Sequence, residues 1–211
     1  MPSLELQKAV SSYETYINNH GIDIDVTRAY HNAIFFAFEK DNDIDYSLKI
    51  APRAKDVMNQ FSTKKYGGDI WELEKFCFAN KTGHEMVDKW YEILKMEAPY
   101  KFESYLLYLE KKREISERFY SPKRKQLNKH GLIQAMQDLE DDKYDRICIS
   151  MPPGTQKTTL EKFFCSWIIG KYPKDYSLFF SHNSDITEKY YKGVLDITTD
   201  NLEYTWSEIF P

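Results

Sequence analysis

Apolar residues recur at three- and four-residue intervals through most of the first 140 residues. In one such run Phe102, Tyr105, Leu106, Leu109 and Ile115 follow this spacing, and charged residues fall between them. This periodicity is typical of amphipathic helices, one face of which packs on a core. The pattern predicts helices over 4–17, 26–40, 69–79, 83–97, 102–120 and 123–140, with turn signals between them. We therefore expect residues 1–115 to form a mostly α-helical N-terminal region.

After residue 143 the pattern changes to short apolar runs that alternate with helical ones. "DRICISM" (145–151) and "DYSLFFSH" (175–182) are predicted to be buried strands, and residues 157–172 and 185–200 to be helices. A strand–helix–strand–helix order with short connections favours a parallel α/β sheet. Two strands are fewer than such sheets usually contain. We therefore expect residues 116–211 to hold the start of an incomplete α/β domain.

The composition of the chain excludes several classes of protein and of binding site. The 211 residues are 42% hydrophobic and 29% charged, which is enough apolar material for a folded core. The net charge of −4 excludes a global nucleic-acid footprint, so any basic patch must be local. Three cysteines lie far apart without a CxxC pair, which argues against a zinc knuckle or a disulfide scaffold. No apolar run approaches the roughly 18 residues of a membrane span, so we expect a soluble intracellular protein.

The connection between the first predicted strand and its helix carries the clearest chemistry. "MPPGTQKTT" (151–159) resembles a phosphate-binding Walker A loop, G-x-x-x-x-G-K-[ST], with Lys157 and Thr158 at the last two positions. A strand would deliver the loop, and the helix that follows would direct its N-terminal N–H groups at phosphates. The loop predicts nucleotide binding by Pro153, Gly154, Thr155, Gln156, Lys157, Thr158 and Thr159. Lys157 would be the catalytic lysine, and the Thr158 hydroxyl would hold Mg²⁺.

Gln156 stands where the motif has glycine. Glycine at that position permits a left-handed backbone, which costs any other residue about 1–2 kcal/mol. We expect this cost to weaken nucleotide binding or slow hydrolysis, and Gly154 to provide one permissive position. The alternative is an ordinary strand–turn–helix connection in which Lys157, Thr158 and Thr159 are exposed and have no role in nucleotide binding.

Several elements in order resemble the ATPase start of the large terminase subunits of tailed phages and prophages. These are Ser150-Met151-Pro152-Pro153, then Trp167, Gly170 and Pro173, then the polar stretch Ser181–Asp185, and the closing "EYTWSEIFP". The resemblance covers about residues 115–211. It implies an additional-strand P-loop ATPase fold that uses ATP and Mg²⁺ to move double-stranded DNA into a capsid.

The same resemblance implies the partners and location of the protein. These are double-stranded DNA, the small terminase subunit and the portal or capsid, with a homo-oligomeric motor in the bacterial cytoplasm and no membrane. It also implies a nuclease domain downstream. No apolar run ending in paired acidic residues follows the loop, so a Walker B element is missing. We therefore expect the full-length protein to be an ATPase and this chain alone to be inactive.

Two further segments have open interpretations. In "RFYSPKRKQL" (118–127), Tyr120 would stack on an adenine base, and Arg124 or Gln126 would form hydrogen bonds with the edge of that base. The alternative is a helix start, with Ser121 as the N-cap and Pro122 at the first helical position. Seven basic residues between Lys111 and Lys125 would contact DNA phosphates or form a solvated helix face.

Two other functions remain open beside the packaging motor. One is a non-catalytic module that docks a partner and carries a degenerate loop. The other is a different P-loop DNA motor, such as a helicase-like ATPase.

Overall fold

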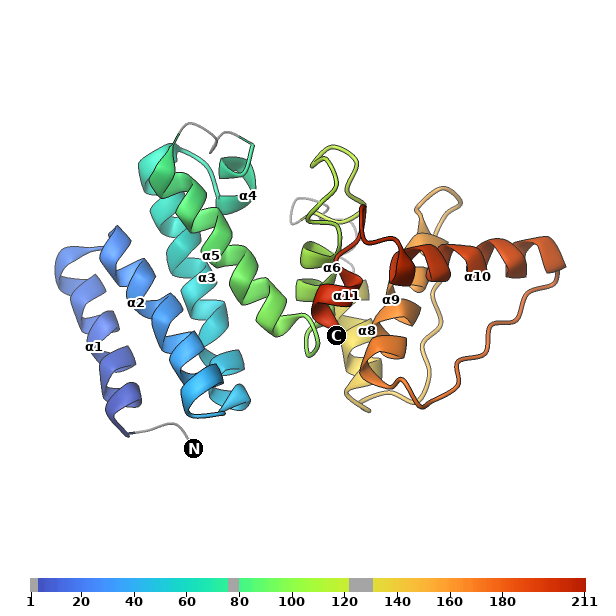
Figure 1. Cartoon of the computed structure of the whole chain (residues 1–211), viewed down its shortest axis with the longest axis horizontal. Helices are drawn as coiled ribbons and strands as arrows, with labels where there is room; N and C mark the ends of the chain where they lie inside the picture. Colours follow the sequence, from blue (N-terminus) through green and yellow to red (C-terminus); the bar gives the residue numbers. More distant parts are fainter. Residues whose placement is uncertain (1–3, 76–79, 122–130) are drawn as a thin grey trace. The chain divides into compact units, whose positions relative to one another are not determined.

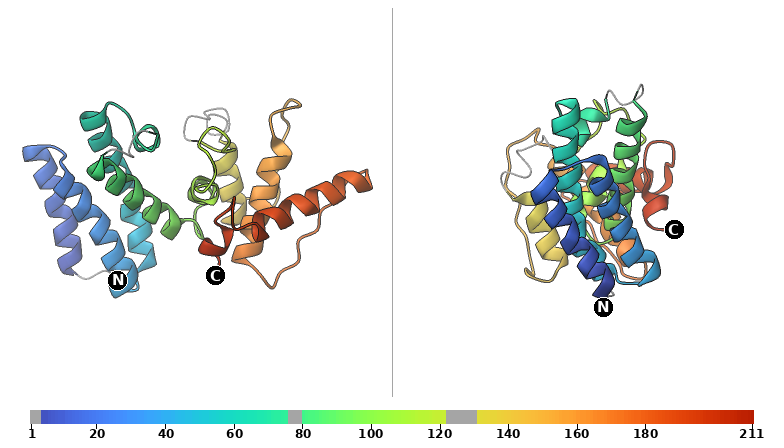
Figure 2. Two further views of the ribbon diagram at one scale, coloured as in Figure 1. Left: turned by 45° about the horizontal axis from the view of Figure 1, so that its top comes forward. Right: turned by 90° about the vertical axis from the view of Figure 1, so that its left-hand side faces the viewer.

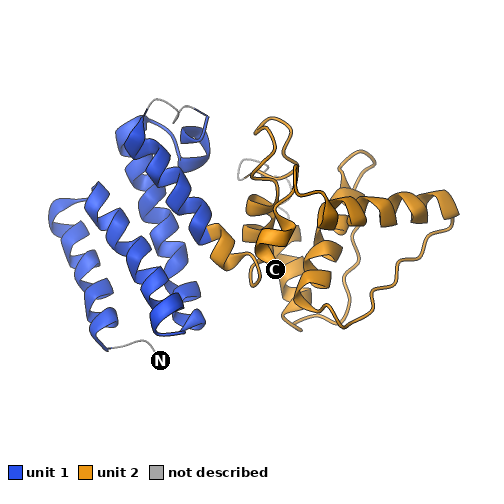
Figure 3. Ribbon diagram, in the orientation of Figure 1, with its two compact units in different colours: residues 1–93 blue, residues 94–211 orange. Residues whose placement is uncertain are grey.

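The computed structural model describes residues 4–75, 80–121 and 131–211 (Figure 1). Its contacts divide the chain into two compact units, Met1–Ile93 and Leu94–Pro211 (Figure 3). Each unit is built from helices, turns and extended segments. The domain division predicted near residue 115 stays a prediction.

Unit 1 is a bundle of helices that pack side by side (Figure 2). They are α1 (Leu4–His20), α2 (Ile24–Phe35) with the π-helical turn η1 (Phe36–Lys40), α3 (Ile44–Tyr66), α4 (Ile70–Leu73) and α5 (Lys81–Glu97), which ends in unit 2. Helix α2 packs against both α1 and α3. Its buried face includes Tyr30 and Ile34, and α3 contributes Val57 and Met58 to the same core.

Aspartates begin three of these helices. The carboxylate of Asp23 accepts from Val26 N at 2.9 Å, Asp43 from Tyr46 N at 2.9 Å, and Asp69 from Glu72 N at 2.8 Å. Each carboxylate satisfies a backbone N–H that has no partner within its own helix. The turns between the helices are therefore encoded locally.

Helix α3 was not among the helices predicted from the sequence, and Pro52 lies inside it. Proline removes one backbone hydrogen bond and usually ends or kinks a helix. Here the whole helix is 23 residues long and ends at Tyr66, followed by the C-cap residue Gly67 with φ of +81°. Ala51 and Ala54, on either side of Pro52, are fully buried. Tertiary packing of this face outweighs the local cost of the proline.

An ion pair joins α1 to α3 and yields a pH prediction. Arg53 donates to both carboxylate oxygens of Glu14 at 2.7 and 2.8 Å, and the Tyr30 hydroxyl donates to the same carboxylate. The hydrogen bond from Arg53 lowers the pKa of Glu14 from 4.5 to about 2. The pair therefore contributes stability that is present above pH 4.5 and is lost as the pH falls towards 2.

We expect Glu14→Gln to lower the stability of the chain by no more than about 1 kcal/mol at pH 7, because the pair is partly exposed. Urea midpoints of wild type and variant should converge between pH 4.5 and 2.5. Asp25→Asn is the control, since Asp25 is exposed and its bond to Arg28 is long at 3.5 Å. A constant difference between Glu14→Gln and wild type across this range would contradict the assignment.

Unit 2 surrounds an aromatic core. Its helices are α6 (Phe102–Leu109), α8 (Leu132–Glu140), α9 (Lys157–Lys171), α10 (Ser184–Thr199) and α11 (Trp206–Ile209). Helix α9 packs against α6 and α10. The Trp167 ring centre lies 5.2 Å from that of Phe102 and 6.4 Å from that of Tyr105. One turn nearer the N-terminus of α9, the Phe163 ring contacts the rings of Phe119 and Tyr204 edge to face.

The predicted α/β fold is wrong, because the described residues contain no β-strand and no parallel sheet. Both helices expected between and after the strands are present as α9 and α10. Residues 146–150 and 176–181 belong to no helix, strand or turn, and their backbones form no ladder with any described residue. Most of their side chains are exposed, with Leu178 at 81% and Phe180 at 85%. Ile147 and Ile149 are half-buried, and the Phe179 ring stacks on Tyr190 of α10 at 3.8 Å. A short apolar run favours burial, and it does not supply the neighbouring strand that a sheet requires.

The long helix predicted over 102–120 is also wrong, since α6 ends at Leu109. The next residue, Glu110, is buried and accepts from Phe119 N at 2.7 Å and from Arg113 at 2.7 Å. This carboxylate folds residues 110–120 into successive turns. Burial raises the pKa of Glu110.

Candidate functional site

The loop before α9 contains two left-handed backbone positions. Gly154 has φ of +80°, and Gln156 has φ of +62° and ψ of +31°. The left-handed conformation that a phosphate loop requires just before its lysine is therefore present at Gln156. Asn42 and Asp142 are the other non-glycine residues with positive φ in the described parts of the chain. Their short side chains are of the types that tolerate this region, whereas glutamine is not.

The N-terminus of α9 begins at the N-cap residue Gln156, whose side chain makes no cap hydrogen bond, and the first turn of the helix contains no acidic residue. The first hydrogen bonds of the helix run from Thr159 N and Leu160 N to Gln156 O at 3.1 and 3.2 Å. The N–H groups of Lys157 and Thr158 bond no described residue. Two donors and the positive end of the helix dipole therefore face outwards from the loop.

The Lys157 side chain folds back over the loop. Its ammonium donates to the carbonyl of Met151 and, at 3.3 Å, to that of Pro152. The Thr155 hydroxyl also donates to Pro152 O, at 2.8 Å. These bonds close the turn around the positive charge, while Pro153 and Thr158 are exposed and Thr159 is half-buried.

The rest of α9 is anchored in the core. Trp167 is fully buried, and its indole N–H donates to Ala98 O at 2.8 Å. The hydroxyls of Tyr105 and Ser166 are 2.6 Å apart within the same core. The first turn of α9, with Lys157, is therefore held on a rigid element.

Of the three residues predicted to bind adenine, Tyr120 lies in the described part of the chain. Tyr120 is 1% exposed, and its hydroxyl donates to Glu103 at 2.7 Å. Its ring therefore offers no free face to a base in this conformation. Arg124 and Gln126 lie outside the described residues. The adenine role of all three stays a prediction.

The described part of the basic stretch is engaged within the protein. Lys112 pairs with Glu208 at 2.8 Å, and Arg113 pairs with Glu110. Arg118 donates to the carbonyls of Arg113 and Lys111. Because these cations already have partners, they offer less to a phosphate backbone than the sequence suggests. Lys123 and Lys125 lie outside the described residues.

A magnesium ion would find a single predicted protein ligand here. Within the described ranges, no group of three or more Asp, Glu, His or Cys side chains could hold a metal. The Thr158 hydroxyl is exposed at the loop. Mg²⁺ often reaches such sites with a nucleotide, because it keeps several waters and binds phosphate oxygens.

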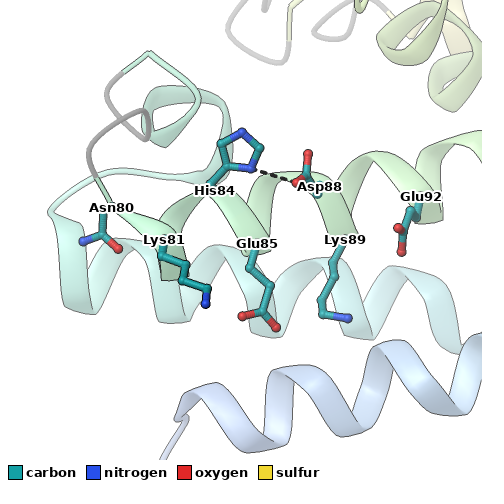
Figure 4. A pocket seen from close by; sticks show the side chains of 7 residues that line it. All are labelled: Asn80, Lys81, His84, Glu85, Asp88, Lys89 and Glu92. Carbon is teal, nitrogen blue, oxygen red and sulfur yellow. Dashed lines mark hydrogen bonds and ion pairs between the residues drawn. The ribbon is translucent and has the colours of Figure 1, made fainter.

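Away from the loop, a hollow of about 670 Å³ lies along α5 in unit 1 and is lined mostly by charged side chains (Figure 4). His84 and Asp88 are bonded at 2.8 Å, and Glu85 binds Arg28 through both oxygens at 2.7 and 2.8 Å. His31 bonds Glu92 at 2.7 Å, and burial lowers the pKa of His31. The pairs of Glu85 with Arg28 and of Glu92 with His31 tie α5 to α2, so the hollow lies over a contact that holds the bundle together.

Sequence reasoning missed another hollow, next to the phosphate-type loop. It encloses about 650 Å³ and is lined by Leu132 and Ala135 of α8, by residues 147–152 and by Thr155. The signal in the sequence is the apolar run at 145–151, which includes Ile147 and Ile149 and was predicted to be a strand. Below we call this space the α8 hollow.

The strained turn gives a stability prediction. We expect Gln156→Gly to raise the free energy of unfolding by about 1 kcal/mol, because relief of about 1–2 kcal/mol exceeds the extra entropy of glycine. Urea unfolding of the full chain measures this difference. Gly154→Ala is the matched control at φ of +80° and should destabilise by about 1–2 kcal/mol. A loss of stability in Gln156→Gly would show that the glutamine side chain holds the turn.

Within the described ranges, no helix is both long and apolar enough to cross a membrane. Comparison of the chain with protein-family models, with curated proteins and with solved structures finds no match.

Proposed function

We propose that residues 151–159 bind the polyphosphate of ATP together with Mg²⁺. The observation that carries this proposal is the left-handed turn at Gly154 and Gln156, which leads directly into the helix α9 beginning with Lys157. Strained backbone of this kind persists where the surrounding structure holds it, and it concentrates at functional sites.

Each residue of the loop has a role in this proposal. The N–H groups of Lys157 and Thr158 donate to phosphate oxygens at the positive end of α9. The Lys157 ammonium leaves the carbonyls of Met151 and Pro152 for the β- and γ-phosphates, because a charged oxygen is a stronger acceptor than a neutral one. The Thr158 hydroxyl completes the Mg²⁺ shell. Pro153, Thr155 and Thr159 shape the loop.

We further propose, on the sequence resemblance, that this loop belongs to the ATP-binding part of a viral DNA-packaging motor. Support comes from the order of Pro152-Pro153, Lys157, Trp167 and Gly170 along the chain. Trp167 and Gly170 both lie on the helix that follows the loop. In such a motor the enzyme would be an ATPase acting on double-stranded DNA with partner subunits.

Titration of the chain with Mg-ATP at low salt, by calorimetry, tests the nucleotide site. We expect weak binding that Lys157→Ala reduces by at least about tenfold, since a charge-assisted contact to phosphate is lost. Lys174→Ala is the matched control, because Lys174 is an exposed lysine in the turn after α9.

Equal binding by wild type and Lys157→Ala would reject the phosphate site. That result would favour a partner-docking module in which the loop has no nucleotide function. We expect Gln156→Gly to keep or improve the affinity for Mg-ATP. No ATP turnover is expected from this chain, because no apolar run ending in paired acidic residues follows the loop to supply a Walker B element.

A further inference from the structure

The α8 hollow adjoins the phosphate-type loop. Pro152 and Thr155 line the hollow and are themselves loop residues, joined by the bond from the Thr155 hydroxyl to Pro152 O at 2.8 Å. Its volume of about 650 Å³ lies within the range of roughly 300–1,000 Å³ that is common for small-ligand sites. The hollow is therefore large enough and close enough to hold another part of a ligand bound at the loop.

The walls of the hollow are mostly apolar. Leu132 and Ala135 come from α8, and Ile147, Ile149 and Met151 come from the extended segment before the loop. Leu132 is buried, and Ile147, Ile149 and Met151 are half-buried. Apolar walls of this kind suit the face of a flat aromatic ring, which gains by leaving water.

The extended segment also offers hydrogen-bonding groups. The backbone N–H and C=O groups of residues 146–150 form no hydrogen bond with any described residue. Each of these residues carries one backbone N–H donor and one C=O acceptor. Main-chain groups beside an apolar slot are the usual means by which a pocket fixes the orientation of a polar heterocycle.

We infer that the α8 hollow binds the nucleobase of the nucleotide whose phosphates occupy residues 151–158. This inference rests on the proposed function and adds the base site to it. A purine fits both features, since its faces are apolar and aromatic and its edge carries donors and acceptors. The base then lies against Leu132, Ala135 and Ile149, and its edge bonds the backbone of residues 146–150.

This placement differs from the one predicted at Tyr120. The Tyr120 ring is buried and its hydroxyl is bonded to Glu103, whereas the α8 hollow is open and shares residues with the loop. A further apolar cavity of about 700 Å³ lies between α10 and residues 175–179. It shares no lining residue with the loop, so it is not continuous with a bound phosphate chain.

Three probes test the inference on the full chain by calorimetry or ligand-observed NMR. They are Mg-ATP, Mg-tripolyphosphate and adenosine. We expect wild type to bind ATP about tenfold or more tightly than tripolyphosphate, because the base adds contacts of its own. Adenosine should bind weakly and compete with ATP.

Ala135→Phe fills the hollow from α8. It should reduce ATP affinity to that of tripolyphosphate, abolish adenosine binding and leave tripolyphosphate binding unchanged. Gln134→Phe is the matched control, because Gln134 is the neighbouring residue and its side chain is exposed. Circular dichroism shows whether both variants fold, and the wild-type comparison of the three probes needs no variant.

The outcomes separate the two proposals. Equal affinity of wild type for ATP and tripolyphosphate, without adenosine binding, overturns the base site and leaves the phosphate site standing. Loss of ATP affinity in Gln134→Phe equal to that in Ala135→Phe also overturns the base site. Adenosine binding that Ala135→Phe removes, without tripolyphosphate binding, supports the hollow and rejects the proposed phosphate site.

Discussion

Replacement of Trp167 by alanine is expected to lower the free energy of unfolding of unit 2 by about 3–5 kcal/mol. The indole is fully buried, lies 5.2 Å from the Phe102 ring and donates to Ala98 O at 2.8 Å. The variant loses this contact area and leaves a buried carbonyl without its donor. Urea unfolding of the full chain, followed by far-ultraviolet circular dichroism, measures the loss.

The control for this variant is Tyr176→Ala, since Tyr176 is 98% exposed and the change also removes an aromatic ring. We expect the control to change the stability by less than about 0.5 kcal/mol. A small effect of Trp167→Ala, similar to the control, would contradict the packing of α9 against α6. Because Lys157 lies on the same helix, nucleotide binding should weaken under any condition that unfolds α9.

Replacement of Gly170 by alanine is expected to destabilise the chain by about 2 kcal/mol, although glycine is the poorer helix former. A Cβ atom at Gly170 would overlap the ring of Phe210. That ring also contacts Trp206 at 5.5 Å and Tyr105 at 6.1 Å, which limits how far it can move. The cost of overpacking, about 3 kcal/mol, therefore exceeds the gain of about 1 kcal/mol from the higher helix propensity of alanine.

Gly193→Ala provides a matched control with the opposite sign. Gly193 lies inside α10, and a Cβ atom there would meet the flexible end of the Lys162 side chain. The lysine can swing away, so we expect a gain of up to about 1 kcal/mol from helix propensity. Thermal unfolding of both variants tests the pair. Stabilisation by Gly170→Ala would show that Phe210 does not lie on α9.

Some parts of the structure follow directly from local sequence. Asp23, Asp43 and Asp69 cap helices because an acceptor side chain at the right position satisfies a nearby N–H group. Both α9 and α10 were predicted from the sequence over 157–172 and 185–200, within one residue of their observed ends. The left-handed turn at Gln156 was also expected, because the motif position requires that backbone conformation.

The failures share a physical cause. The apolar runs at 145–151 and 175–182 indicated strands, yet the backbones of residues 146–150 and 176–181 pair with no other segment of the described chain. The helix predicted through residue 120 ends at Leu109, since the buried Glu110 carboxylate binds backbone N–H groups nine and ten residues later. Tertiary packing can also lengthen a helix, because the buried residues Ala51 and Ala54 stabilise α3 on both sides of Pro52.

For the candidate site, the sequence by itself determined which residues form the loop, where α9 begins and which lysine stands at its first turn. These properties depend on residue type and spacing, which act over a few residues. Only the tertiary structure decided that Tyr120 is buried, that the cations at 112–118 are paired, and that a hollow opens between α8 and residues 147–152. Burial and charge pairing depend on contacts between segments distant in the chain, and no local pattern encodes which segments will meet.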